Sequence, residues 1–427
     1  MRKIFANGTD DTAFLEELGK RAGETNKKVT ETVSAIIEDV RLNGDSAVKN
    51  YTLKFDGNLP EYYEIPRDVI NDALTEADPE FVSALLNAQE NIADFHNRQK
   101  EQGFINPKEN GVILGQRVRG LTRVGLYVPG GTAAYPSSVL MNAIPAKIAG
   151  VKEIVMVTPP LKDGTPNKDI LVAAAICGVD RIFMSGGAQA IAALAYGTEE
   201  IPKCDKIVGP GNIYVATAKK LLYGVVDIDM IAGPSEILVI ADETANPKFA
   251  AADLMSQAEH DVLASAIMVT TSEKLADETI AEINRQKEYL SRKDIIEKSL
   301  NDYGAVIIAG SREKCVELAN KIAPEHLEVL MENPMELLGS LDNAGSIFLG
   351  HYASEPLGDY YAGPNHVLPT SGTARFFSPL GVASFTKRTS YTYYTREALE
   401  EAKDDIVLIA EKEGLTAHAN AIKVRFE

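Results

Sequence analysis

The sequence is poor in cysteine. It has only Cys177, Cys204 and Cys315, and no two of them form a CxxC pair. An odd and scattered set of this kind offers no thiolate zinc site, and it is typical of reduced thiols. We therefore expect a protein of a reducing compartment, without disulfide bonds.

Long apolar runs are also missing. The longest ones, such as "ILVIA" at 237–241, have the length of a strand, whereas a membrane-spanning helix needs about 20 apolar residues. The first residues, "MRKIFANGTDDTAFLEELGK", lack the apolar core and the small-residue cleavage pattern of a signal peptide. We expect no membrane segment and a cytoplasmic location.

Positive charge is scarce as well. The formal net charge is −18 and the sequence pI is near 4.9, and Lys and Arg do not cluster. Phosphate contacts dominate nucleic-acid affinity, so this balance disfavours a nucleic-acid partner. With 45% hydrophobic and 24% charged residues, the 427-residue chain has the composition of a globular enzyme or binding protein of two or three domains.

The pattern of the chain changes near residue 120. Residues 10–103 are mostly helical in pattern, with one run that ends at Gly44. From about 120, short β-branched runs alternate with helical segments, and a second series of this kind covers 236–350. Such alternation predicts parallel sheets covered by helices, so we predict an α/β fold with two parallel-sheet units. We divide the chain into a mainly helical region 1–120, two α/β domains at 121–233 and 234–380, and a helical tail at 381–427.

The hexapeptide "SQAEHD" at 256–261 is the first candidate site. It closes a helix that we expect to begin at Asn246, with Pro247 in the first position. Gln257 and His260 are three residues apart, so their side chains should point to the same side of this helix. Taken alone, such a pair is more often a helix-capping pair than a metal site.

Other histidines lie in loop-like polar surroundings. Glu325 and His326 precede a buried strand, and a carboxylate beside an imidazole can act as acid and base near neutral pH, although isolated pairs of this kind are more often structural. His366 and Asp359 lie around a turn that Gly358, Gly363 and Pro364 would make rigid, and here the two interpretations are balanced. We interpret His96 and His351 as structural. If Gln257, His260, Asp359 and His418 converge, they form a nitrogen and oxygen ligand set suited to zinc or manganese in an open site.

Glycine-rich turns form a second constellation. The turn at Gly130–Gly131 leads from a strand into a helix. Similar glycine-rich turns occur in "GPGNIYVATAKK" at 209–220 and in "AGPSEILV" at 232–239. Backbone amides at such turns can approach a phosphate closely. However, the sequence contains no GxGxxG or GxxxxGK[ST], and plain tight turns explain each segment about as well.

Four stretches closely resemble segments of the histidinol dehydrogenase family: "IDMIAGPSEILVIADETANPKFAAADLMSQAEHD" (228–261), "APEHLE" (323–328), "GDYYAGPNHVLPTSGTARFFSPLGV" (358–382) and "EGLTAHANAI" (413–422). The resemblance spans nearly the whole chain. It implies two related, incomplete Rossmann-like domains, with the N-terminal region contributing to the second one. It also implies oxidation of L-histidinol to L-histidine through L-histidinaldehyde, with two NAD reduced and one zinc ion per subunit, as the last step of histidine biosynthesis.

The resemblance also implies roles for individual residues. The expected zinc ligands are Gln257, His260, Asp359 and His418. The expected acid–base pair is Glu325 and His326. Further substrate contacts are expected from Ser235, His366 and Glu413, in addition to the zinc ligands and His326. NAD contacts are expected from Tyr127, Gln189 and Asn212. The family forms homodimers in which the C-terminal segment reaches the partner's site, so His418 and Glu413 are expected to act in trans.

Three alternatives compete with this interpretation. Relatives within the fold oxidise other small alcohols, such as a sulfonated propanediol, and His366 and Glu413 favour histidinol over them. A zinc hydrolase could also use a Glu–His pair with a metal, and a non-catalytic nucleotide-binding module would need no metal. A covalent thiohemiacetal mechanism is disfavoured, because no cysteine lies in a matched site segment.

Overall fold

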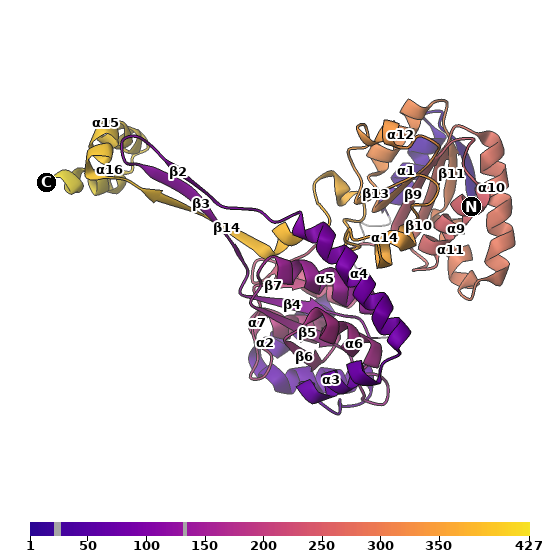
Figure 1. Cartoon of the computed structure of the whole chain (residues 1–427), viewed down its shortest axis with the longest axis horizontal. Coiled ribbons are helices and arrows are strands. Elements are labelled where there is room, and N and C mark those ends of the chain that lie inside the picture. Colours follow the sequence, from indigo (N-terminus) through magenta and orange to yellow (C-terminus); the bar gives the residue numbers. More distant parts are fainter. Residues whose placement is uncertain (21–26, 131–134) are drawn as a thin grey trace.

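The structure, a computed structural model, describes residues 1–20, 27–130 and 135–427. Within these residues the strands form two parallel sheets and one antiparallel sheet. Each parallel sheet is the centre of one α/β unit, and the antiparallel sheet extends from the first unit as a long arm (Figure 1).

The first sheet has five parallel strands in the order β6-β5-β4-β7-β8. Its strands are β4 (Arg123–Tyr127), β5 (Glu153–Thr158), β6 (Arg181–Met184), β7 (Lys206–Val208) and β8 (Asp227–Ile228). Alternate residues face opposite sides, as strand geometry requires. Ile154 and Met156 join one core cluster, and Val155 and Val157 join the other. The sheet is therefore buried on both faces.

Two groups of helices cover this sheet. On one face lie α3 (Arg67–Glu76), α4 (Pro79–Asn97), α5 (Pro136–Ile148) and α6 (Lys168–Cys177). On the other face lie α2 (Lys27–Asp56), α7 (Gly187–Tyr196) and α8 (Ile213–Leu222). Helical geometry in α2 is interrupted at Gly44, whose φ is 52°, so the predicted helix end there corresponds to a break rather than a stop.

The second sheet has six parallel strands in the order β1-β11-β10-β9-β12-β13. Its strands are β1 (Arg2–Phe5), β9 (Glu236–Ala241), β10 (Ser265–Thr270), β11 (Ala305–Ile308), β12 (His326–Leu330) and β13 (Ser346–Leu349). One face carries α9 (Pro247–Ala258), α10 (Glu273–Gln286) and α11 (Lys293–Tyr303). The other carries α1 (Asp10–Lys20) and α12 (Arg312–Ile322). The predicted α/β class, with two parallel sheets covered by helices, is confirmed.

The N-terminal region is shared between the two units. β1 pairs with β11 of the second sheet, and α1 packs on that sheet. However, α2, α3 and α4 pack on the first sheet, so the N-terminal region contributes to both units, whereas we expected a contribution to the second one. The reason is packing: α2 buries Val33 and Val48 against α7, a contact that local sequence pattern does not encode.

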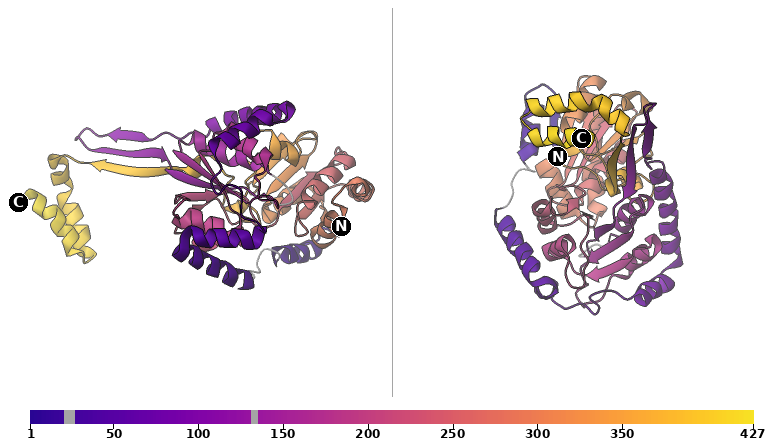
Figure 2. Two further views of the ribbon diagram at one scale, coloured as in Figure 1. Left: turned by 90° about the horizontal axis from the view of Figure 1, so that it is seen from below. Right: turned by 90° about the vertical axis from the view of Figure 1, so that its left-hand side faces the viewer.

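The arm is built from β2 (Phe104–Pro107), β3 (Ile113–Gly120) and β14 (Thr386–Tyr393), in the order β14-β3-β2. It ends in α15 (Arg396–Lys412) and α16 (Thr416–Lys423), which lie away from both units (Figures 1 and 2). The predicted helical tail thus begins with a strand. "TKRTSYTY" is rich in β-branched and aromatic residues, which favour strands, but it is polar and almost wholly exposed.

The remaining short elements connect these parts. They are η1 (Lys287–Tyr289), α13 (Met335–Leu338), α14 (Glu355–Tyr360), η2 (Thr373–Arg375), η3 (Val382–Phe385) and η4 (Val424–Phe426). Among the described residues, no helix combines the length and the apolarity needed to cross a membrane.

Candidate active site

Helix α9 carries the first two candidate residues. The side chain of Asn246 caps its start by accepting a hydrogen bond from the backbone N–H of Lys248 at 3.0 Å, and Pro247 occupies the first position, as predicted. Gln257 is buried in the last turn, and its Oε1 atom has no hydrogen-bond partner among the described residues. A buried amide oxygen without a partner is costly, which points to a ligand outside the chain.

His260 meets two carboxylates of α14. The ligand atoms of His260, Glu355 and Asp359 all lie within 4.8 Å of one another. Glu355 and Asp359 are four residues apart and so share one face of their helix. Burial, and then the charge of Asp359, raise the pKa of Glu355 to about 7. The three groups form a nitrogen and oxygen donor cluster that could hold a metal ion.

Sequence reasoning missed Glu355. It follows Ser354 in the first turn of α14, where an acidic residue is usually explained by the helix dipole. The available signal was the i, i+4 spacing to Asp359, which places both carboxylates on one side. Ser256, the first residue of the hexapeptide "SQAEHD", also contacts this cluster, because its Oγ donates a hydrogen bond to Glu355 Oε2 at 2.8 Å.

Glu325 and His326 lie at the start of β12, beside this cluster. His326 Nδ1 is 3.7 Å from Glu325 Oε2, and His326 Nε2 is 3.7 Å from Asp359 Oδ1. Nδ1 also lies 3.2 Å from the carbonyl oxygen of Glu236, which can only accept, so Nδ1 carries a proton. Nε2 is buried without a hydrogen-bond partner among the described residues and faces the cluster.

The electrostatics of this pair follow from its burial. Desolvation raises the pKa of Glu325 to about 8. Burial alone would lower the pKa of His326, but the carboxylates of Glu325 and Asp359 outweigh it and raise this pKa to about 10. Burial alone would raise the pKa of Asp359. The interaction of this carboxylate with His326 outweighs burial and keeps the pKa of Asp359 below its usual value. The pair therefore holds at least one proton at neutral pH.

His366 connects the cluster to the first unit. Its Nδ1 lies 3.1 Å from the carbonyl oxygen of Asp359, and its Nε2 lies 3.5 Å from Oγ of Ser138, on α5. The turn between Asp359 and His366 depends on Gly363, whose φ is 115°. Gly363 also lies so close to the carbonyl oxygen of Asn91 that a Cβ would be only 2.8 Å from this oxygen. The predicted rigid turn thus places His366 between the two units.

The candidate groups of the second unit gather at the amino ends of its parallel strands. Ser235 directly precedes β9, Glu325 precedes β12, and His260 lies in the connection that enters β10. Open α/β sheets usually bind ligands at the carboxyl ends of their strands. For Ser235 and Glu325 this edge follows from their positions directly before strands, whereas for Asp359 it depends on the packing of α14, which local sequence pattern does not encode.

The first unit has its cavity at the carboxyl ends. Tyr127, Gln189 and Asn212 line one cavity of about 590 Å³, so the three residues expected to contact NAD lie together. Tyr127 ends β4, Gln189 is in the first turn of α7, and Asn212 caps α8 by accepting from the N–H of Tyr214 at 3.0 Å. Of the predicted Gly130–Gly131 turn, Gly130 lines this cavity and Gly131 lies outside the described residues.

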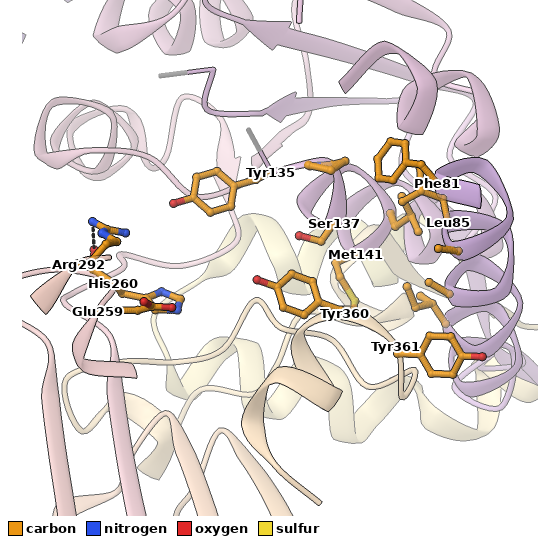
Figure 3. A pocket seen from close by; sticks show the side chains of 15 residues that line it. Phe81, Leu85, Tyr135, Ser137, Met141, Glu259, His260, Arg292, Tyr360 and Tyr361 are labelled. Carbon is orange, nitrogen blue, oxygen red and sulfur yellow. Dashed lines mark hydrogen bonds between the residues drawn. The ribbon is translucent and has the colours of Figure 1, made fainter. Parts of the chain in front are cut away.

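A groove of about 490 Å³ opens beside His260, between the two units. Its walls come from α4 and α5 of the first unit and from Tyr360, Glu259 and Arg292 of the second, as Figure 3 shows. Arg292 Nη2 donates to the carbonyl oxygen of His260 at 3.4 Å. Tyr135 lines both this groove and the cavity of the first unit, so the two spaces adjoin.

The structure does not bring His418 and Glu413 to these groups. Both are exposed on the tip of the arm, Glu413 at the end of α15 and His418 on α16. The tip, with α15 and α16, lies far from α9 and α14, which carry the metal-donor cluster (Figure 1). Within one chain, therefore, the expected set of ligands is reduced to Gln257, His260 and Asp359, with Glu355 beside them.

Fold and site together define an α/β enzyme with two parallel-sheet units, in which one unit carries a cavity of about 590 Å³ and the other carries the candidate metal-donor and acid–base groups. The sequence model of the histidinol dehydrogenase family matches residues 19–426. The chain belongs to the histidinol dehydrogenase family, whose members are oxidoreductases. The predicted resemblance is thereby confirmed.

Individual relatives support this membership. A histidinol dehydrogenase of Clostridium acetobutylicum is 58% identical over 426 residues, which cover 100% of this chain and 99% of the relative. One of Caldanaerobacter subterraneus is 56% identical over 418 residues, 97% of each chain. The crystal structure of histidinol dehydrogenase from Elizabethkingia anophelis superposes with a TM-score of 0.93 at 39% identity and covers 100% of this chain and 98% of its own.

Proposed function

We propose that this chain oxidises L-histidinol to L-histidine through L-histidinaldehyde, with two NAD reduced, as the last step of histidine biosynthesis. Family membership supports the reaction, and one observation carries it: the buried His326 lies 3.7 Å from Asp359 of the metal-donor cluster. A base is thus placed next to a site that can hold the substrate. No observation favours oxidation of a sulfonated propanediol instead.

The donor set fits zinc. Gln257, His260 and Asp359 offer nitrogen and oxygen donors, and the unpartnered Oε1 of Gln257 is satisfied if it coordinates an ion. We propose that these three residues hold zinc, together with His418 of a second copy. When bound, zinc would orient the amine and imidazole of the substrate. It would also offset the charge of Asp359, which would lower the pKa of His326 so that its imidazole can accept a proton.

The chain's own groups then divide the work of proton transfer. His326 Nε2 takes the hydroxyl proton of histidinol while the carbon-bound hydrogen leaves with its electron pair, which yields the aldehyde. Glu325 takes a proton from a water whose oxygen bonds to the aldehyde carbon, and His326 returns its proton to the carbonyl oxygen. A hydrated carbon with a second transferable hydrogen forms, and His326 is again free to accept a hydroxyl proton. Tyr127, Gln189 and Asn212 would hold NAD in the cavity that they line, and NAD would supply the hydride acceptor for each of the two oxidations.

Substrate contacts complete the proposal. Ser235 and His366 lie at the edges of the site, and we propose that they contact the substrate along with Gln257, His260, His326 and Asp359. Glu413 and His418 would come from a second copy, because they lie at the end of α15 and on α16, at the distant tip of the arm. The tip exposes apolar side chains that a partner can cover: Ile406, Leu408, Ile409 and Leu415. We therefore propose a homodimer with a shared site.

Two further parts of the proposal rest on the cysteines and on the topology. Cys177, Cys204 and Cys315 are all buried and free, as a reducing cytoplasmic location would leave them, and a covalent thiohemiacetal does not form part of the proposed reaction.

The domain boundaries at 121–233 and 234–380 remain a proposal, with β1 and α1 added to the second domain.

The experiment is removal and restoration of zinc. Protein treated with a chelator should lose histidinol-dependent NADH formation and regain it when zinc is added, and His260→Ala should lower both the zinc content and the rate. His351→Gln is the matched control, since His351 lies outside the site, and it should keep both. Zinc-loaded, folded protein that forms no NADH from histidinol would contradict the function. Metal-free protein with the full rate would contradict only the role of zinc.

A further inference from the structure

The cavity of the first unit contains an acidic side chain that the proposed reaction does not use. Asp56 is the last residue of α2 and lines this cavity together with Tyr127, Gln189 and Asn212. Its Oδ2 atom is buried and has no hydrogen-bond partner among the described residues. Two aromatic rings, of Phe55 and Tyr214, are partly exposed around the same cavity.

The position of Asp56 is unfavourable for the fold alone. A carboxylate at the C-terminal end of a helix faces the negative end of the helix dipole. Burial adds to this cost and raises the pKa of Asp56 to about 6. Lys54, the nearest basic residue along the helix, lies over the rings of Tyr51 and Phe55, 5.9 Å and 5.4 Å from their centres. A carboxylate placed at such a cost in the lining of a cavity indicates a ligand that donates hydrogen bonds.

The chemistry of the cavity restricts what this ligand group can be. The same cavity is lined by the N-terminal turn of α7, Gly186 to Gln189, where the helix dipole favours the phosphates of a dinucleotide. A carboxylate cannot face a phosphate without repulsion, so Asp56 must face a neutral donor. In NAD the phosphates are joined to the 5′ oxygens of the two riboses, so the neutral donors nearest to them are the ribose hydroxyls, and paired hydroxyls match the two oxygens of a carboxylate.

The position of Tyr135 distinguishes the two riboses. Tyr135 lines both this cavity and the groove beside His260, so the nicotinamide end of the dinucleotide must lie on that side. The residues of α2 line only the first cavity, which leaves the adenosine end to them. We infer that Asp56 accepts hydrogen bonds from the 2′- and 3′-hydroxyls of the adenosine ribose, and that its charge excludes the 2′-phosphate of NADP. This inference rests on the proposed function.

The test compares Asp56→Asn with Asp302→Asn. Asp302 is a matched control, because it also lies in the last turn of a helix, α11, but is about half exposed, pairs with Lys298 and lies in the second unit. Binding of NADH and of NADPH to each protein is measured by calorimetry, without substrate, and the melting temperature is measured without any dinucleotide.

The expected results are specific to a ribose contact. Asp56→Asn should weaken NADH binding about tenfold or more, because a hydrogen bond to a charged acceptor is lost. NADPH binding should stay the same or strengthen, so the preference for NADH falls, while the melting temperature of the dinucleotide-free variant rises. Asp302→Asn should leave both affinities at the wild-type value.

Other results would overturn the inference, and they separate it from the proposed function. If Asp56→Asn binds NADH as the wild type does, or loses affinity for NADH and NADPH by equal factors, Asp56 does not contact the adenosine ribose. Either result leaves the proposed reaction intact. If the wild-type protein binds neither dinucleotide, the proposed function fails and the inference fails with it.

Discussion

At the scale of single residues, the proposed reaction gives Glu325 and His326 separate tasks. In this proposal His326 serves each alcohol oxidation and Glu325 serves hydration of the aldehyde, so their variants should fail at different steps. Loss of a positioned acid or base typically lowers a rate by about 10²- to 10⁴-fold. We expect Glu325→Gln to form the first NADH and accumulate histidinaldehyde, and His326→Gln to form little of either.

Rapid-mixing measurements of NADH, with aldehyde trapping, check this division. His351→Gln, an imidazole replaced outside the site, should follow the wild-type time course. Equal losses in both steps for Glu325→Gln would contradict the assignment of Glu325 to hydration.

Asp56 makes a prediction on stability and pH. Its pKa is raised in the folded protein, so ionisation opposes folding, and the penalty grows as pH rises from the unfolded value near 4 to the folded value of about 6. Asp56→Asn removes the penalty. Because the side chain is only partly buried, we discount the effect to roughly 1 kcal/mol. The variant should melt at a higher temperature than the wild type at pH 7, and this gain should shrink toward pH 4.5. A gain that is constant over this range would contradict the pKa argument.

At the scale of elements, a buried ion pair braces the loop before α8. Lys219 and Asp229 are almost fully buried and form a salt bridge. Lys219 Nζ donates to the carbonyl oxygen of Gly209 at 3.0 Å, and the N–H of Gly209 donates to Asp229 Oδ2 at 2.9 Å. This pair therefore fixes the loop that leads to Asn212, one of the residues proposed to contact NAD.

Breaking that pair should cost stability and cofactor affinity together. Lys219→Met leaves the Asp229 carboxylate buried without its cation, which typically costs about 3 kcal/mol or more. The double variant Lys219→Met/Asp229→Asn should recover part of this loss, because no buried charge remains. Urea unfolding and NADH binding check the prediction. A single variant as stable as the wild type would show that the pair does not brace the loop.

The elements also show what the sequence can predict. The start of α9 at Asn246 and Pro247 was predictable, because capping is local. The strand β14 was missed, since its polar and exposed residues give no apolar alternation and its pairing with β3 joins segments more than 250 residues apart. Glu355 was missed for a related reason: only the packing of α14 against α9 reveals that its carboxylate meets His260.

At the scale of the whole molecule, the arm is the reason for proposing that a second copy completes the site. Its tip carries His418 and Glu413 away from their own site and exposes Leu408 and Ile409. We expect His326→Gln and His418→Ala to be nearly inactive alone. After they are unfolded and refolded together, mixed dimers have one intact site each, and the activity should return to about a quarter of the wild type. No recovery in mixed dimers identified by mass spectrometry would contradict a site shared between copies.

The central claim is that one site carries out both oxidations of histidinol. The most direct measurement is the number of NADH formed per L-histidinol consumed by zinc-loaded protein, with L-histidine quantified in the same samples. The account predicts two NADH and one histidine per histidinol. One NADH per histidinol with histidinaldehyde as the final product, or histidinol consumption without NADH, would contradict it.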